Sequence, residues 1–304
     1  MLIQEKIRQT NFSDAEQNVI NYILNRPQSL NLTIKEVAEA AFVHPSTLIR
    51  IAKKLDFTGW LEFKTAFSKE QDYLTHHFQT VDANLPFAPK DGLLRIASKL
   101  AQLEQTTISD TLSLLQHDAL KKAKELLLSA RITRIFGNNA NTLIAQDFAV
   151  KMNRIGKIVT TSQIQGETAY EAYNLTPSDA AILISYTGEN KMILQTAHIL
   201  SQQHVPIIAI TSIGDNSLMQ LATCTLQMTT RERLYSKIGN FTTNLSITYL
   251  LDVLYSVVFA ENYQQELDHL IKIGQQIDHR QISSTIMAEK KQPPVQIHDS
   301  FTPN

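Results

Sequence analysis

Apolar positions recur with helical spacing in two short stretches near the amino terminus. In residues 33–41, four apolar residues share one helical face, namely Ile34, Val37, Ala38 and Ala41. In residues 45–55, a second apolar face is formed by Leu48, Ile51, Ala52 and Leu55. The rotation of about 100° per residue then predicts a polar opposite face that carries Ser46, Arg50, Lys53 and Lys54.

The residues at the starts of both helices suit a first turn, where backbone N–H groups have no partner within the helix. Thr33 and Glu36 form a capping box, and Pro45 stands in a first turn, where its missing N–H costs nothing. A capping box also opens residues 11–25, and a further amphipathic helix is predicted over 60–71. We therefore predict a compact all-α unit.

From residue 131 onward, the apolar runs become short and alternate with helical stretches. Strands are predicted at 132–137, 157–161, 180–185, 206–212 and 224–228. Helices are predicted between them at 141–154, 164–173, 190–203 and 217–221. Five strands that alternate with helices are typical of a doubly wound α/β domain with a five-stranded parallel sheet.

The segments around this domain differ in character. Residues 76–90 contain Pro86 and Pro89 and predict a linker, and helices follow at 91–116 and 118–130. The stretch 240–260 is apolar nearly all round, so we expect it in a domain core or a subunit interface. A last packing helix is predicted at 263–280, and residues 285–304 predict a disordered tail.

Composition and charge fit an ordinary globular chain. The 304 residues are 43% hydrophobic and 19% charged, and the net charge is −1, so any basicity is local. The stretch 44–69 carries five cations against two anions, which would attract phosphate. The single cysteine, Cys224, lies in an apolar run and is expected to fill core space. No signal peptide or uninterrupted apolar span is apparent, so we expect a cytoplasmic protein without a membrane segment.

Loops rich in hydroxyl, amide and glycine residues follow the predicted strands. They cover residues 136–142, 185–190 and 211–217. Because ligands of open α/β sheets bind at the carboxyl ends of strands, Ser185, Thr187 and Gly188 form a candidate anion nest. The alternative is that these residues only cap helices and form turns, as they do in many strand-to-helix loops.

Two sequence blocks together resemble the RpiR/MurR family of bacterial transcription regulators. The first runs from FSDAEQNVINYIL through TIKEVAEAAFVHPSTLIRIAKKLDFTGW, and the second includes LTPSDAAILISYTGEN and VPIIAITSIGDNSLMQLA. The resemblance implies a helix-turn-helix DNA-binding domain over 1–75 and a sugar-isomerase-type (SIS) domain over 91–284. It also implies double-stranded operator DNA, a phosphorylated sugar effector, and a homodimer or homotetramer.

The resemblance assigns roles to particular residues. DNA contact is expected from Ser46, Thr47, Arg50, Lys53 and Lys54. Phosphosugar binding is expected from Asn139, Asn141, Ser185, Thr187, Gly188, Asn190 and Glu232. This chain departs from the family pattern at Phe42, which replaces a turn glycine, and at His44, which replaces a capping serine. Asn141 and Asn190 replace hydroxyl residues, and Glu232 reads equally well as a surface carboxylate.

Two functions remain open at this point. The favoured one is a non-enzymatic regulator whose operator affinity depends on a phosphosugar, with no cofactor and no metal. The alternative is an aldose–ketose phosphosugar isomerase, which needs a positioned acid or base. No histidine lies between His117 and His198 to serve the loops at 136–142 and 185–190, but Glu167, Glu171 or Glu189 could still serve as the base.

Overall fold

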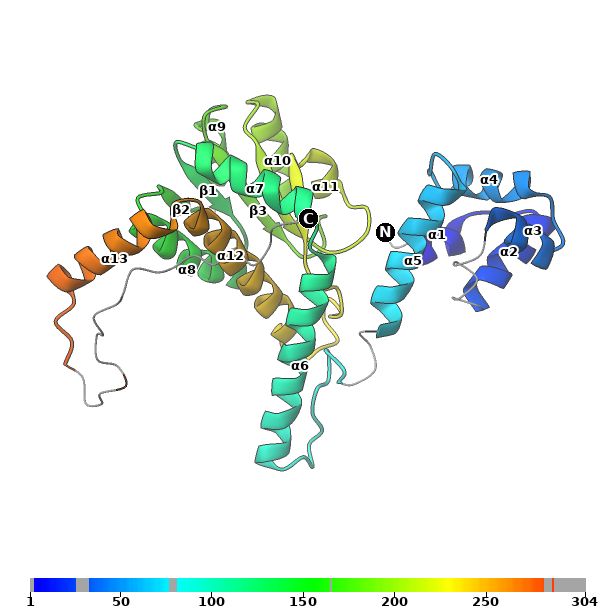
Figure 1. Cartoon of the computed structure of the whole chain (residues 1–304), viewed down its shortest axis with the longest axis horizontal. Coiled ribbons are helices and arrows are strands. Elements are labelled where there is room, and N and C mark those ends of the chain that lie inside the picture. The colour runs from blue at the N-terminus through cyan, green and yellow to red at the C-terminus, as the bar shows by residue number, and fades with distance from the viewer. Residues whose placement is uncertain (1–2, 26–32, 77–80, 165, 282–285, 287–304) are drawn as a thin grey trace, which may run out of the picture.

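The computed structural model describes residues 3–25, 33–76, 81–164, 166–281 and 286. Five helices form the amino-terminal unit (Figure 1): α1 (Ile3–Gln9), α2 (Asp14–Asn25), α3 (Ile34–Ala40), α4 (Pro45–Lys54) and α5 (Trp60–His76). Their shared core contains Ile20, Val37, Leu48, Ile51 and Phe63. The predicted all-α unit is confirmed.

Helix α1 was not predicted. Its Ile7 is buried in the core of the unit, and the Glu70 carboxylate of α5 accepts from the N–H groups of Ile3 and Gln4 at 2.6 and 2.9 Å. These bonds satisfy first-turn donors that have no partner within the helix. A carboxylate far along the chain therefore caps α1, which local sequence reasoning could not see.

The carboxy-terminal domain is built on five parallel strands in the order β2-β1-β3-β4-β5. They are β1 (Thr133–Phe136), β2 (Val159–Thr161), β3 (Ala180–Ser185), β4 (Ile207–Thr211) and β5 (Cys224–Gln227). The predicted five-stranded parallel sheet is confirmed. The strand order reverses between β1 and β3, and this switch point is where doubly wound sheets bind ligands.

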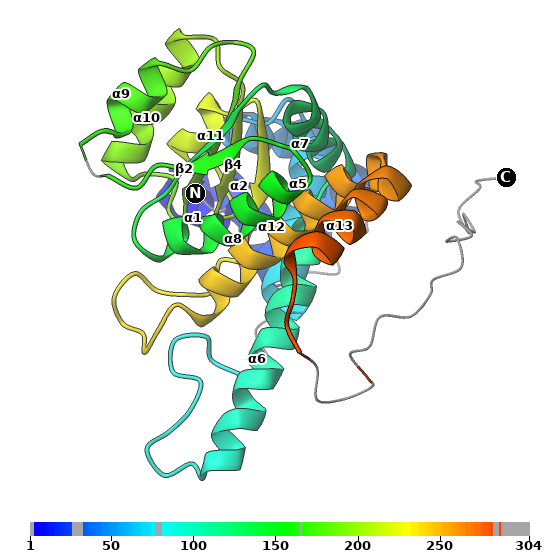
Figure 2. The ribbon, with the colours of Figure 1, turned by 90° about the vertical axis from the view of Figure 1, so that its left-hand side faces the viewer.

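Helices cover both faces of the sheet (Figures 1 and 2). On one face, Ile182 and Ile184 of β3 pack with α7 (His117–Ser129), α8 (Ala140–Arg154) and α12 (Phe241–Glu261). On the other, Ala181 and Leu183 pack with α9 (Thr168–Tyr173), α10 (Lys191–Gln202) and α11 (Ser217–Leu221). Successive side chains of a strand point to opposite faces, which is why β3 is apolar throughout. Cys224 in β5 is half-buried, and burial raises the pKa of its thiol to about 11.

Helix α6 (Leu93–Leu114) packs against α12, and its amino-terminal half projects away from the sheet (Figures 1 and 2). Part of the predicted linker also belongs to this packing, because Val81 and Ala83 are buried against Leu103 of α6. Helix α13 (Tyr263–Ile277) follows α12 and contains no buried residue. The predicted tail lies outside the described residues, apart from Ile286.

Helix α12 is long and apolar enough to cross a membrane by length and composition, the only such helix within the described residues. It packs against α6, α7 and α8, and Ile247, Leu250 and Leu254 lie in the domain core. Packing within the domain therefore accounts for the apolar composition of α12.

Candidate functional site: a cationic helix and a polar loop cluster

The exposed side of α4 is the candidate DNA-reading surface. Leu48, Ile51 and Ala52 are buried, while Ser46, Arg50, Lys53 and Lys54 are exposed, as predicted from the helical rotation. Thr47 is a correction, because it is only 8% exposed and packs inward. It stands four residues before the buried Ile51, so it falls on the inner half of the helix.

The turn before α4 keeps a glycine-like backbone without glycine. Phe42 has φ of 56°, a left-handed conformation that is strained for a bulky residue, and its side chain is 95% exposed. His44 takes over the cap, since its Nδ1 accepts from the Ser46 N–H at 3.3 Å and lies 2.8 Å from the Ser46 Oγ. The two departures from the family pattern are thus accommodated.

Two of the cations of α4 are held by a carboxylate of α2. Glu16 is 1% exposed, and its oxygens accept from Arg50 Nε and from Lys54 Nζ, both at 2.7 Å. Burial alone would raise the pKa of Glu16. The bonds from Lys54, the Ser13 N–H and Arg50 outweigh burial and lower this pKa to about 2. The carboxylate is therefore ionised, and it fixes the positions of both cations.

The second candidate site lies where β1 and β3 end. Ser185 is buried, Thr187 is half-buried, and Gly188 has φ of 68°. A Cβ at Gly188 would lie 2.1 Å from Asn216 Oδ1, so only glycine fits there. The Gly188 carbonyl also accepts from the Leu218 N–H at 3.1 Å. The loop after β3 is therefore packed directly on the start of α11.

Glu189 also bonds to the start of α11, so its carboxylate is not free to act as a base. Its carboxylate accepts from the Ser217 N–H at 2.7 Å and from the Ser217 hydroxyl at 2.8 Å. These two bonds lower the pKa of Glu189. A second candidate base, Glu171, forms an ion pair with Arg134 at 3.0 Å.

The asparagines of the two loops occupy helix starts. Asn190 caps α10, because its Oδ1 accepts from the N–H groups of Met192 and Ile193 at 3.1 and 3.2 Å. Asn139 is exposed at the start of α8 with φ of 53°, and Asn141 is half-buried two residues further on. Loops 137–142 and 185–190 therefore meet at the switch point, with the N-termini of α8 and α10 beside them.

The structure corrects both expectations for Glu232, which is neither a surface carboxylate nor free to face a sugar. Its side chain is 0% exposed. One oxygen accepts from the N–H and hydroxyl of Thr242 and from the Thr243 N–H, and the other from the Thr243 hydroxyl and Lys237 Nζ. Five donors use all the acceptor positions of a carboxylate. Glu232 therefore caps α12.

Sequence reasoning missed Lys237, which supplies a cation near the loop cluster. Its Nζ lies 3.0 Å from Glu232 and 5.7 Å from the centroid of the Tyr186 ring. Tyr186 sits between Ser185 and Thr187, so a positive charge lies beside a loop that carries none of its own. No local pattern could bring Lys237 and Tyr186 together.

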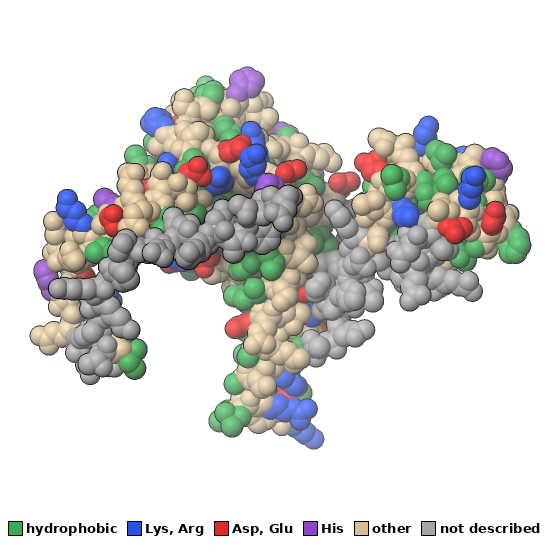
Figure 3. All heavy atoms as spheres, viewed as in Figure 1, with side chains coloured by type: hydrophobic (Ala, Val, Ile, Leu, Met, Phe, Trp, Pro, Cys, Tyr) green, Lys and Arg blue, Asp and Glu red, His purple; other side chains and the backbone are tan. Residues whose placement is uncertain are grey.

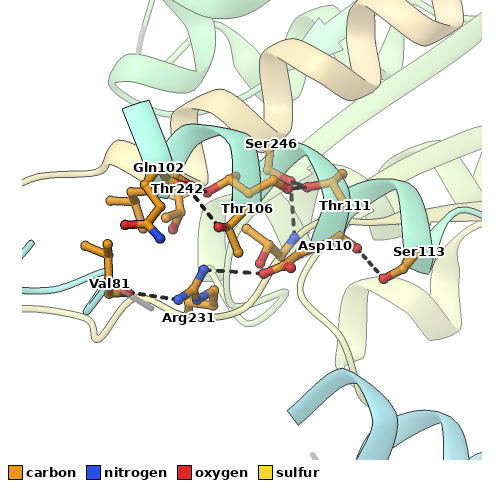
Figure 4. A network of polar contacts seen from close by, with 12 residues as sticks. Val81, Gln102, Thr106, Asp110, Thr111, Ser113, Arg231, Thr242 and Ser246 are labelled. Carbon is orange, nitrogen blue, oxygen red and sulfur yellow. Dashed lines mark hydrogen bonds and ion pairs between the residues drawn. The ribbon is translucent and has the colours of Figure 1, made fainter. Parts of the chain in front are cut away.

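A buried polar network was also missed (Figure 4). Arg231 donates from Nη2 to the Val81 carbonyl at 2.9 Å, and its Nη1 lies 3.5 Å from Asp110 of α6. Thr111 of α6 shares a 2.8 Å hydrogen bond with Ser246 of α12. Through Arg231, the segment that follows β5 is therefore joined to Val81 of the predicted linker and to Asp110 of α6. Within the described residues, no group of three or more His, Cys, Asp or Glu is placed to hold a metal ion.

Comparison with known proteins identifies both parts of the chain. Residues 1–72 match the helix-turn-helix domain of the rpiR family, and residues 126–257 match the SIS domain. The chain is 23% identical over 276 residues to an HTH-type transcriptional regulator of Caldanaerobacter subterraneus subsp. tengcongensis, covering 90% of this chain and 96% of that protein.

Solved structures agree in fold. Vibrio vulnificus NanR complexed with ManNAc-6P has a TM-score of 0.56 at 20% identity, covering 90% of this chain and 96% of that chain. The sugar isomerase domain of an RpiR transcription factor from Sphaerobacter thermophilus has a TM-score of 0.52 at 18% identity, covering 59% and 98%. The chain therefore belongs to the RpiR-type helix-turn-helix transcriptional regulators that carry a SIS domain.

Proposed function

We propose that this protein is a DNA-binding regulator of sugar-metabolism genes whose operator affinity is changed by a phosphorylated sugar. The observation that carries the proposal is the exposed stripe of α4, where Ser46, Arg50 and Lys53 stand on a helix with a fully packed back. A short helix of this kind fits the major groove, with cations positioned for phosphates or base edges. Lys54 adds charge beside the stripe.

The proposed effector site is the loop cluster at the switch point. Hydroxyl, amide and backbone donors come from Asn139, Asn141, Ser185, Thr187 and Gly188. The N-termini of α8 and α10 favour an anion there, and Lys237 lies nearby. The Oδ1 of Asn190 caps α10, so only its Nδ2 remains to donate a hydrogen bond to a ligand. NanR, which shares this fold, was solved with a phosphorylated sugar.

We also propose that the protein acts as a homodimer or homotetramer in the cytoplasm. Helix-turn-helix domains commonly read two half-sites about one helical turn apart, which requires two reading helices. Large apolar side chains stay exposed on the projecting part of α6, including Leu93 and Leu94, and Figure 3 shows hydrophobic and cationic side chains at its free end. With α13, which contains no fully buried residue, these surfaces suit a second copy.

An isomerase activity has weaker support. The fold is shared with a sugar isomerase domain, but Glu189 is committed to α11 and Glu171 to Arg134. The third candidate base, Glu167, is exposed, and its side chain makes no capping hydrogen bond. A protein that only isomerised sugars would also have no use for α4.

The proposal is tested by two linked measurements. A panel of sugar phosphates that includes ManNAc-6P is screened by thermal shift, and any hit is added to an anisotropy titration of promoter DNA from the protein's own gene region. We expect a hit to change DNA affinity in the intact protein and not in Thr187→Val. Arg50→Ala should lose DNA affinity with or without the hit. Failure to bind promoter DNA at low salt would overturn the proposal.

A further inference from the structure

One apolar side chain interrupts the cationic stripe of α4. Ile49 is 41% exposed, whereas Leu48 and Ile51 on either side of it in the helix are fully buried. Ser46, Ile49, Arg50 and Lys53 stand at i, i+3, i+4 and i+7, so they share one face. Figure 3 shows hydrophobic and cationic side chains interspersed on the surface of the helical unit. Any surface that meets Arg50 therefore also meets Ile49.

The orientation of Arg50 is set by Glu16. The bond to the buried carboxylate uses Nε, and the Arg50 side chain is still 59% exposed. The two Nη groups are therefore left to pair with another acceptor. Because Glu16 already fixes the Arg50 guanidinium, this side chain loses little further rotamer freedom when it binds. Its position therefore contributes to sequence specificity as well as to charge.

The chemistry of the major groove gives each of these side chains a partner. Two Nη groups match the O6 and N7 acceptors of guanine, which is the commonest specific contact of arginine. An aliphatic side chain has one favourable partner among the base edges, the 5-methyl group of thymine. A side chain next to Arg50 on the same face would meet a neighbouring base pair.

We propose that Ile49 is a specificity-determining residue that contacts a thymine methyl group in each half-site, next to a guanine read by Arg50, and that Glu16 is the positioning residue for Arg50. This inference rests on the proposed function, since it requires α4 to lie in the major groove. It extends that function by naming the bases that the helix reads.

The test begins with selection from a library of duplexes that contain a randomised central segment. The full-length wild type, Ile49→Ala, Glu16→Gln and Leu61→Ala are selected in parallel. Leu61 is a matched control, because it is an apolar residue of the same unit, 72% exposed, on α5 and not on α4. Each thymine of the wild-type consensus is then replaced, one at a time, by deoxyuridine, which lacks only the methyl group.

We expect one deoxyuridine position per half-site to weaken wild-type binding about fourfold, the effect of burying one methyl group. The same replacement should leave Ile49→Ala unaffected, and Leu61→Ala should behave as the wild type. Glu16→Gln should lose preference for the adjacent guanine while its affinity for an unselected duplex stays equal or rises. A merely structural role of Glu16 would lower both affinities together.

The outcomes separate this inference from the proposed function. If the wild type selects a consensus but no deoxyuridine replacement changes its affinity, the Ile49 contact is wrong and the regulator function stands. If Ile49→Ala changes the oligomeric state in solution and leaves base preference intact, Ile49 is a subunit contact and the inference is overturned. If the wild type selects no sequence at all, the proposed function fails and takes the inference with it.

Discussion

The Tyr186 hydroxyl is bonded twice to the backbone of Glu232. It donates to the Glu232 carbonyl at 2.8 Å and accepts from the Glu232 N–H at 3.1 Å. Tyr186 belongs to the proposed effector loop, and Glu232 caps α12 beside Arg231, which binds the Val81 carbonyl. Three short contacts therefore connect the effector loop with the segment that follows the helical unit in sequence.

Tyr186→Phe removes the hydroxyl and leaves two backbone groups of Glu232 without their partner. We expect a loss of about 1–3 kcal/mol in the free energy of unfolding, because half-buried polar groups become unsatisfied. We also expect a smaller effector-induced change in DNA affinity, with the effector-free affinity unchanged. Urea unfolding and anisotropy titrations measure the two effects. An undiminished response to effector would rule out this connection as the route of coupling.

Two glycines with similar left-handed backbone conformations isolate the role of the loop after β3. Gly188 and Gly156 have φ of 68° and 75°, but an added Cβ meets Asn216 Oδ1 only at Gly188, and nothing lies within 4 Å at Gly156. We expect Gly156→Ala to cost about 1–2 kcal/mol of stability from the left-handed backbone alone. Gly188→Ala should cost about 1–3 kcal/mol more from overpacking.

Chemical unfolding of both variants measures that difference, and the thermal-shift response to sugar phosphates measures its effect on the site. Only Gly188→Ala should lose the response, since Gly156 lies outside the loop cluster. Equal stability of the two variants would show that Asn216 moves aside at little cost.

Local patterns predicted most of the fold. The strand AAILIS and the helix at 217–221 match β3 and α11, because continuous burial and capping residues mark them within a few positions. The exposed face of α4 followed from helical rotation in the same way. Thr47 was expected to contact DNA from the family resemblance and not from that rotation, and its burial agrees with the rotation.

Long-range pairing set the limit of prediction. Glu16 appeared in the sequence as half of a capping box, and its bonds to Arg50 and Lys54 depend on how α2 packs on α4. Glu232 was expected either to face a sugar or to lie on the surface between Arg231 and Arg233, yet the tertiary fold carries it to the start of α12. The tertiary fold likewise brings Lys237 next to Tyr186. Such contacts require the assembled domain, whereas periodicity reports only on neighbours along the chain.

The buried pair of Arg231 and Asp110 provides a third prediction. Their side chains are 2% and 0% exposed and lie 3.5 Å apart. Arg231→Met leaves the Asp110 carboxylate buried without its cation, so we expect a loss of about 3–5 kcal/mol in stability. The double variant Asp110→Leu/Arg231→Met should recover much of this loss, because no buried charge is left. A double-mutant cycle in urea measures the coupling, and additive effects would contradict it.

The lowered pKa of Glu16 makes the stability of the helical unit depend on pH. Its pKa falls from the ordinary value of 4.5 to about 2, so its stabilising contribution is fully present above pH 4.5 and is lost as pH falls toward 2. Trp60 is the only tryptophan and lies in the core of this unit, so its fluorescence reports unfolding there. We expect Glu16→Gln to be less stable than the wild type at pH 7, and the difference to shrink steadily between pH 4.5 and 2. Glu104→Gln on α6, outside the unit, serves as the control. A difference that is constant across this range would mean that the Glu16 charge does not stabilise the native state.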